Sequence, residues 1–88
     1  MPGFDTAARY QLDPDVALRP EPFGALAYHY GTRRLTFLRS RLLADLVREL
    51  DQHESVEAAL EAVVPQSGRA SYRQALASLA DSRFICAC

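Results

Sequence analysis

The stretch from residue 19 to residue 38 constrains the fold most, because it contains two segments of strand character separated by one turn signal. Residues 24–30 alternate, with one face made of Leu26, Tyr28 and Tyr30 and the other of Ala25, Ala27 and His29. Gly31-Thr32 supplies a turn, and residues 34–38 return as a second strand. The stretch therefore predicts a β-hairpin.

Further strand signals precede the hairpin. Residues 10–12 and 16–19 are short apolar segments separated by the turn sequence Asp-Pro-Asp. Pro20 and Pro22 cannot donate to a sheet ladder, so they belong at an edge or in a connection. We expect residues 16–38 to form a three-stranded antiparallel meander that needs helices to cover one face.

Three amphipathic segments follow the strands. Ser40 is placed to cap the first helix, residues 55–64 form the second up to Pro65, and residues 70–82 form the third. Their apolar stripes consist of Leu42, Leu43, Leu46, Val47, Leu50, Val56, Ala59, Leu60, Val63, Tyr72, Ala75, Leu76 and Leu79. The pattern predicts a small α+β domain of winged-helix type, with a three-stranded antiparallel sheet followed by three helices. We expect one domain over residues 9–88 and a flexible N-terminal tail over residues 1–8.

The charge is nearly balanced overall and uneven locally. The 88 residues are 49% apolar and 24% charged with a formal net charge of −1, which is typical of a globular domain and argues against general nucleic-acid binding. Residues 33–41 carry four arginines and no acid, whereas residues 45–61 carry six acids and one arginine. This asymmetry favours an acidic partner at one specific place.

Catalytic and metal-binding patterns are weak in this chain. Its two histidines, His29 and His53, have no serine or cysteine spaced to pair with them, so we expect no catalytic residues. Cys86 and Cys88 alone are too few ligands for a zinc site, so we expect no metal. We expect Phe84 and Ile85 to return an apolar end to the core, and the residues after them to form a free tail or, equally, Cys86 to be buried as a small apolar residue. The absence of a signal-peptide pattern or a long apolar run predicts a soluble cytoplasmic protein.

Two binding functions stay open from the residues alone. A winged-helix DNA-binding regulator would use the polar positions of the third helix, Arg69, Ser71, Arg73 and Gln74. The other candidate is the edge of the sheet formed by residues 34–38, which would lack a neighbouring strand on one side. Arg33 and Arg34 would either discourage pairing at this edge or attract the acidic residues of an incoming peptide.

Specific blocks of the sequence resemble a known family. RPEPFGALAYHYGTRRLTFL, the preceding YQLDPDVAL and the later YRQALASLADS are similar to the peptide chaperones of mycofactocin biosynthesis, which are PqqD-like proteins built on the RiPP recognition element. The resemblance covers about residues 10–85. It implies a non-catalytic protein that binds the leader of a ribosomally made precursor peptide by β-strand addition. It also implies delivery to a radical S-adenosylmethionine maturase, which oxidatively decarboxylates the C-terminal tyrosine of the peptide and links it to the neighbouring valine.

The resemblance also implies a binding site and a set of partners. The backbone of Arg34, Leu35, Thr36, Phe37 and Leu38 would pair with the leader, and Arg33 and Arg34 would meet its carboxylates. The wall of the groove would be Tyr72, Arg73, Leu76 and Leu79. The iron–sulfur clusters and S-adenosylmethionine would belong to the maturase, since this chain has no CxxxCxxC run. We therefore expect no cofactor, no nucleic-acid partner and no membrane partner.

Overall fold

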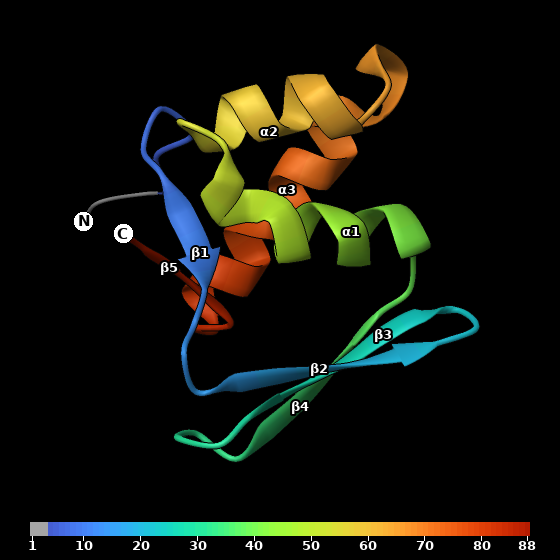
Figure 1. The fold of residues 1–88 in the computed structure, drawn as a ribbon, viewed down its shortest axis with the longest axis vertical. Coiled ribbons are helices and arrows are strands. Elements are labelled where there is room, and N and C mark those ends of the chain that lie inside the picture. Colours follow the sequence, from blue (N-terminus) through green and yellow to red (C-terminus); the bar gives the residue numbers. More distant parts are fainter. Residues whose placement is uncertain (1–3) are drawn as a thin grey trace.

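The computed structural model describes residues 4–88 and places three helices over one face of an antiparallel sheet (Figure 1). In chain order the elements are β1 (Tyr10–Leu12), β2 (Val16–Glu21), β3 (Gly24–His29), β4 (Arg34–Leu38), α1 (Arg41–Glu49), the 3-10 helix η1 (Leu50–Gln52), α2 (Val56–Val63), the 3-10 helix η2 (Gln66–Gly68), α3 (Arg69–Asp81) and β5 (Ile85–Ala87). The strands form a three-stranded sheet in the order β2-β3-β4 and a two-stranded sheet of β1 and β5. The predicted α+β class is confirmed.

The inner face of the three-stranded sheet is built from small residues. Ala25 and Ala27 of β3 are buried, and Ala27 lies between Leu18 of β2 and Thr36 of β4 in the ladder. Alanines let α1 pack close to β3, because they leave little side chain between the helix and the sheet. The alternation predicted for this strand is confirmed, and its other face points away from the helices.

The first two helices begin at serine caps, and all three pack their predicted apolar stripes toward the core. The Ser40 Oγ accepts from the Leu43 N–H at 3.1 Å, and the Ser55 Oγ accepts from the Ala58 N–H at 3.0 Å. The largest fully buried side chains come from all three helices, η1, the residue after α2 and β5: Leu46, Leu50, Leu60, Leu76, Ile85, Val47, Val56 and Val64. No helix in residues 4–88 is long and apolar enough to cross a membrane.

The C-terminal segment is a strand. The predicted return of Phe84 and Ile85 to the core is confirmed, and the prediction of a free tail after them is wrong. Residues 85–87 pair antiparallel with β1, Leu12 opposite Ile85 and Tyr10 opposite Ala87. The Cys88 N–H continues the ladder to the Arg9 carbonyl at 3.0 Å. The physical reason is that Phe84 and Ile85 are buried in the core, which brings the residues that follow them alongside β1.

The turn between β3 and β4 is longer than the two residues expected. Residues 30–33 form the loop, and Arg33 adopts a left-handed conformation with φ 60°. The buried His29 holds this loop, because its Nδ1 accepts hydrogen bonds from the backbone N–H groups of Gly31 at 3.0 Å and Thr32 at 3.1 Å.

The predicted N-terminal tail falls partly outside the described residues, which begin at Phe4. Within the described part, the carbonyl groups of Thr6 and Ala8 accept hydrogen bonds from Glu57 and Val56 at the start of α2. Phe4 stacks edge-on against Tyr10 with ring centroids 4.8 Å apart. Residues 4–8 thus lie against the helical layer.

Candidate functional site

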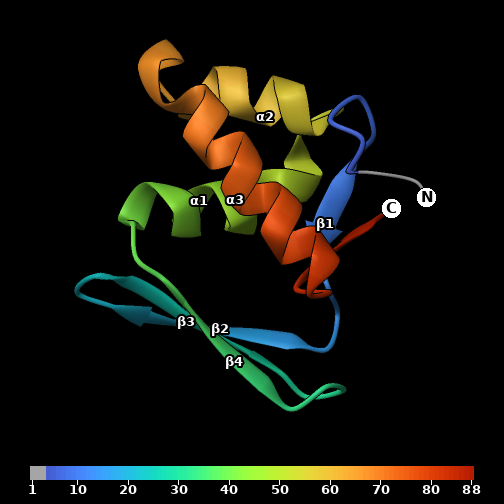
Figure 2. The same ribbon diagram turned by 180° about the vertical axis from the view of Figure 1, so that it is seen from behind.

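The outer edge of β4 has no neighbouring strand within residues 4–88. β4 pairs with β3 on one side only, as the third strand of the sheet. The C-terminal strand β5 pairs with β1 instead, and in both ribbon views it lies away from β4 (Figures 1 and 2). An unpaired edge presents backbone donors and acceptors that a further strand can use.

The close approach between Gly24 and Leu38 shows which backbone groups of β4 point toward β3 and which point outward. A Cβ atom at Gly24 would overlap the carbonyl oxygen of Leu38, so this oxygen points toward β3. In an antiparallel ladder, backbone groups alternate between the two sides of the strand. The N–H and C=O groups of Leu35 and Phe37 therefore point outward, whereas those of Thr36 point toward β3.

The side chains of β4 divide between two environments. Leu35 and Phe37 lie on the outer face of the sheet and are 56% and 51% exposed. On the inner face Leu38 is buried, Thr36 is half-buried and Arg34 is exposed at the end of the strand. A strand added beside β4 would meet apolar side chains on the outer face and polar ones toward the end of the inner face.

Arginines lie at both ends of β4. Arg33 and Arg34 are exposed and have no ion-pair partner among residues 4–88. At the other end, the Arg39 guanidinium lies over the Phe37 ring, 5.8 Å from its centroid, in a cation–π contact. The Arg41 Nε donates to the Pro22 carbonyl at 3.2 Å. The edge is therefore positively charged at both ends.

Of the four expected wall residues, Tyr72 contacts the segment that follows β4. Its hydroxyl and the Ser40 Oγ form a hydrogen bond of 2.7 Å, which ties α3 to the junction between β4 and α1. A pocket of about 190 Å³ opens there, lined by Arg39, Ser40, Leu43, Ser71, Tyr72 and Ala75. The sequence predicts Ser40 as a helix cap and Ala75 as a core residue, and neither as part of the site. The spacing of Ser71, Tyr72 and Ala75 within about one helical turn was the available signal.

The other three wall residues make contacts inside the domain. Leu76 and Leu79 are buried in the core. Arg73 donates to both carboxylate oxygens of Glu57, at 2.7 and 3.3 Å. This hydrogen bonding lowers the pKa of Glu57 below its ordinary value and raises that of Arg73.

The arginines of α3, which the DNA-binding alternative would use, also make contacts inside the domain. Arg69 donates to the carbonyls of Val64 at 2.9 Å and Glu61 at 3.2 Å, and Arg73 is paired with Glu57. Both guanidinium groups are therefore bound within the chain, on the side of α3 that packs against α2.

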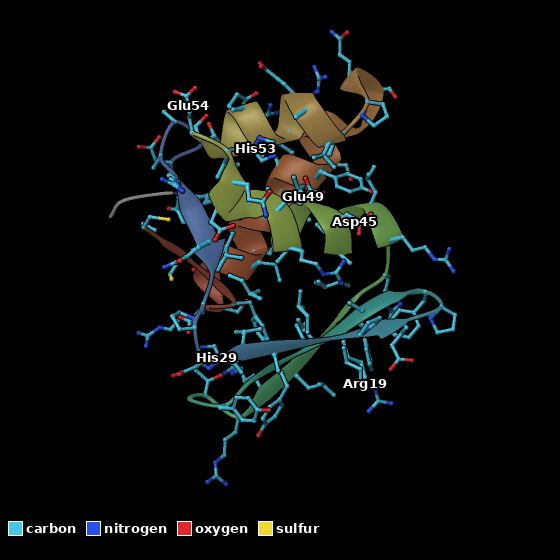
Figure 3. All side chains as sticks on the ribbon, in the orientation of Figure 1. Arg19, His29, Asp45, Glu49, His53 and Glu54 are labelled. Atoms are coloured by element: carbon cyan, nitrogen blue, oxygen red, sulfur yellow. The ribbon has the colours of Figure 1, made fainter. Side chains whose placement is uncertain are left out.

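The titratable groups form no reactive cluster in the described part of the chain. No three histidines, cysteines or acids are placed there to hold a metal ion. Figure 3 shows Asp45, Glu49 and His53 along α1 and the turn after it, with the His53 Nε2 3.9 Å from Glu49 Oε1. Burial, and then the nearby Asp13 carboxylate, raise the pKa of Cys86, which keeps this group a thiol at neutral pH.

Comparison with known proteins gives a consistent result. The sequence profile of the peptide chaperone MftB family matches residues 9–86. A peptide chaperone MftB from Mycobacterium ulcerans is 46% identical over 83 residues, which cover 93% of this chain and 76% of that protein. Proteins of the same name from Mycolicibacterium smegmatis and Mycobacterium tuberculosis are 42% and 41% identical over 83 residues, covering 93% of this chain and 81% and 76% of theirs. No solved structure matched the chain.

Proposed function

The chain belongs to the peptide chaperone MftB family, a group of non-catalytic proteins, and we propose that it captures the leader of a ribosomally made precursor peptide by β-strand addition to β4. In this proposal the bound peptide is then presented to the radical S-adenosylmethionine maturase of mycofactocin biosynthesis. The observation that supports strand addition most directly is the unpaired outer edge of β4.

The geometry of this edge suits an extended peptide. The outward N–H and C=O groups of Leu35 and Phe37 provide two donors and two acceptors for a new strand. In recognition of this kind, backbone hydrogen bonds supply affinity, while side-chain pockets select sequence and register. The pocket beside Tyr72 and Ser40 lies at the end of β4 and is placed to accept one side chain of the peptide.

The charges along the edge indicate what the peptide carries. Arg33 and Arg34 have exposed guanidinium groups next to the start of β4. Arginine binds carboxylates through a planar pair of N–H groups, so acidic side chains in the leader would be held there. Leu76 and Leu79 would contribute by fixing the position of α3, and Arg73 by joining α3 to α2.

A peptide that orders on binding loses conformational entropy, so the affinity is expected to be moderate. Dissociation constants from micromolar to below micromolar correspond to about −8 to −10 kcal/mol. That range permits both capture and release, as delivery requires.

Replacing the outward donor of β4 tests strand addition. The synthetic leader of the mycofactocin precursor peptide is titrated by calorimetry into Leu35→Pro and, as the matched control, Leu35→Ala. Proline removes the outward N–H, whereas alanine keeps it and shortens only an exposed side chain. We expect Leu35→Pro to lose measurable binding while its circular dichroism spectrum stays that of the folded domain, and Leu35→Ala to bind within a few-fold of the unchanged chain. Full affinity in folded Leu35→Pro would contradict strand addition.

Presentation to the maturase is tested by turnover. The purified maturase is given precursor peptide with and without the chain, and decarboxylation of the C-terminal tyrosine is followed by mass spectrometry. We expect the chain to increase the rate and the Leu35→Pro variant not to. An equal rate with and without the chain would contradict the delivery role but not peptide capture.

A further inference from the structure

The outer face of the three-stranded sheet is apolar and uncovered. Within residues 4–88, every large hydrophobic side chain that is exposed lies on this face or at its margin: Phe23 at 43%, Tyr30 at 64%, Leu35 at 56% and Phe37 at 51%. The half-buried Leu26 and Tyr28 lie between them on β3. The helices lie on the opposite side of the sheet, where α1 packs against β3 and β4 (Figure 2). From this surface we propose that the outer face is a docking site for the enzyme that modifies the bound peptide, and that this enzyme presents apolar side chains bordered by carboxylates.

The aromatic groups on this face are held in place before any partner arrives. Phe23 and Phe37 meet edge to face with centroids 5.9 Å apart, and Tyr28 and Tyr30 do so at 5.0 Å. Phe23, Phe37 and Arg39 line a shallow pocket of about 320 Å³. Aromatic and arginine side chains contribute most of the binding energy in many protein interfaces, and ordering them in advance lowers the entropic cost.

The charges around the face select an acidic partner. Arg19 points away from the helices (Figure 3) and lies in the row of Leu26 and Phe37. Arg39 directly follows the last residue of β4. Arg33 lies at the opposite end of this strand, in the loop between β3 and β4. The acids near this face are Glu21, which pairs with Arg19 at 2.9 Å, and Asp15 beside the β3–β4 loop, so positive charge remains in excess.

The same charges disfavour a second copy of this chain as the occupant. A two-fold dimer that packs this face against itself brings either like ends or opposite ends of the hairpin together. Because arginines lie at both ends, each arrangement sets arginine against arginine, which is unfavourable. A partner with carboxylates around an apolar patch meets no such repulsion.

Continuity with the β4 edge identifies which partner this is. Leu35 and Phe37 belong both to the outer face and to the strand that would pair with the peptide. A protein docked on the face would therefore touch the added strand, as an enzyme acting on that peptide must. This inference rests on the proposed function, and it concerns a surface separate from the peptide-binding edge.

The test uses variants that leave β4 unchanged. Phe23→Ser/Tyr30→Ser removes two exposed aromatics, and Asp45→Asn/Glu49→Gln changes the exposed acidic surface of α1 as a matched control. Binding of the purified maturase to each chain loaded with leader peptide is measured by interferometry, and peptide affinity is measured separately by calorimetry. We expect the aromatic variant to bind the maturase about tenfold or more weakly, since two hot-spot side chains are lost, and to keep its peptide affinity within about twofold. The control is expected to match the unchanged chain in both measurements.

A second variant changes charge instead of removing aromatic side chains, so the docking surface can be tested if the aromatic variant does not fold. Arg19 lies on the outer face, outside the peptide-binding edge and its pocket. Arg19→Glu is expected to weaken maturase binding several-fold, to reduce its salt dependence and to keep the peptide affinity within about twofold. Maturase binding unchanged in both face variants, or lost only in the acidic control, would overturn the docking surface. So would a dimer seen by analytical ultracentrifugation that the aromatic variant abolishes, because the occupant would then be a second copy. If the unchanged chain bound peptide but no maturase, the docking surface would fail and peptide capture would stand.

Discussion

The two sheets of this small domain differ in their strand pairing and in the exposure of their side chains. In the two-stranded sheet, β5 pairs with β1, and Ile85 anchors the pairing in the core. In the three-stranded sheet, the β4 edge is unpaired within residues 4–88, and the outer face carries the exposed aromatic side chains. The C-terminal strand thus pairs within the chain, whereas the β4 edge is unpaired within residues 4–88, and we propose that a peptide partner occupies it.

The two sheets differ in how much they contribute to the stability of the domain. β1 and β5 lie against α1, η1 and α3, so changes there disturb the core. β4 contributes one buried residue, Leu38, while Leu35 and Phe37 are more than half exposed. The chain can therefore vary the open edge at little cost in stability, which is the usual condition for a binding surface on a rigid scaffold.

The largest effect is expected at Gly24, where the open sheet joins the helices. Gly24 has φ 149°, and an added Cβ would also lie 2.8 Å from the Ser40 carbonyl oxygen. We expect Gly24→Ala to lower the free energy of unfolding by about 3 kcal/mol or more, because both the backbone conformation and the contact are unfavourable. Urea denaturation measures this. Gly68→Ala is the control, since a Cβ there meets only Val64 at 3.6 Å and Tyr72 at 3.9 Å; an equal loss in both variants would refute the explanation.

Ile85 tests the closed sheet against the open one. We expect Ile85→Ala to cost about 2–4 kcal/mol, as is usual for a buried isoleucine, and Leu35→Ala to cost about 0.5 kcal/mol or less. Chemical denaturation of the two variants gives the comparison directly. Similar losses would show that the edge of β4 supports the core as much as β5 does.

Reversing the charges at the start of β4 is expected to act on binding alone. Arg33→Glu/Arg34→Glu should weaken binding of the leader peptide about tenfold, or about 1.4 kcal/mol, and flatten its dependence on salt. Calorimetry at two salt concentrations measures both effects. Arg48→Glu is the control, because Arg48 lies on α1 and pairs with Asp45 at 3.1 Å. An affinity unchanged by the double reversal would rule out contact with carboxylates.

The smallest effect is expected from pH at the Glu57–Arg73 pair. The hydrogen bond from Arg73 depresses the pKa of Glu57 in the folded state, so the pair stabilises the domain above the ordinary glutamate pKa of 4.5. That contribution is lost as the pH falls through the depressed value. The melting temperature of Arg73→Met should therefore be lower than that of the unchanged chain at pH 7, and the two melting temperatures should converge at pH 3. A constant difference across this range would argue against the linkage.

Local patterns were enough to predict much of the fold. Alternation in residues 24–30 gave β3 its two faces, and the serines at positions 40 and 55 marked the starts of α1 and α2. The four arginines near β4 pointed to an acidic partner before any geometry was available. These features depend on neighbours within a few residues, which a sequence displays directly.

Long-range contacts could not be read in the same way. The sequence predicted that Phe84 and Ile85 return to the core, but nothing in it indicated that the residues after them would pair with β1, more than seventy residues away in the chain. Nor did the stripe on α3 show which element each side chain would meet, since Tyr72 reaches Ser40 whereas Leu76 and Leu79 pack in the core. An amphipathic pattern says that a side chain is turned inward, but not which element it meets.

The sequence by itself determined the elements, their faces and the positive charge beside β4, because backbone preference and hydrophobic periodicity act locally. Only the tertiary structure decided that the C-terminal segment forms a strand that pairs with β1. The reason is that a strand pairs where packing of its flanking residues places it, and that placement depends on the whole core.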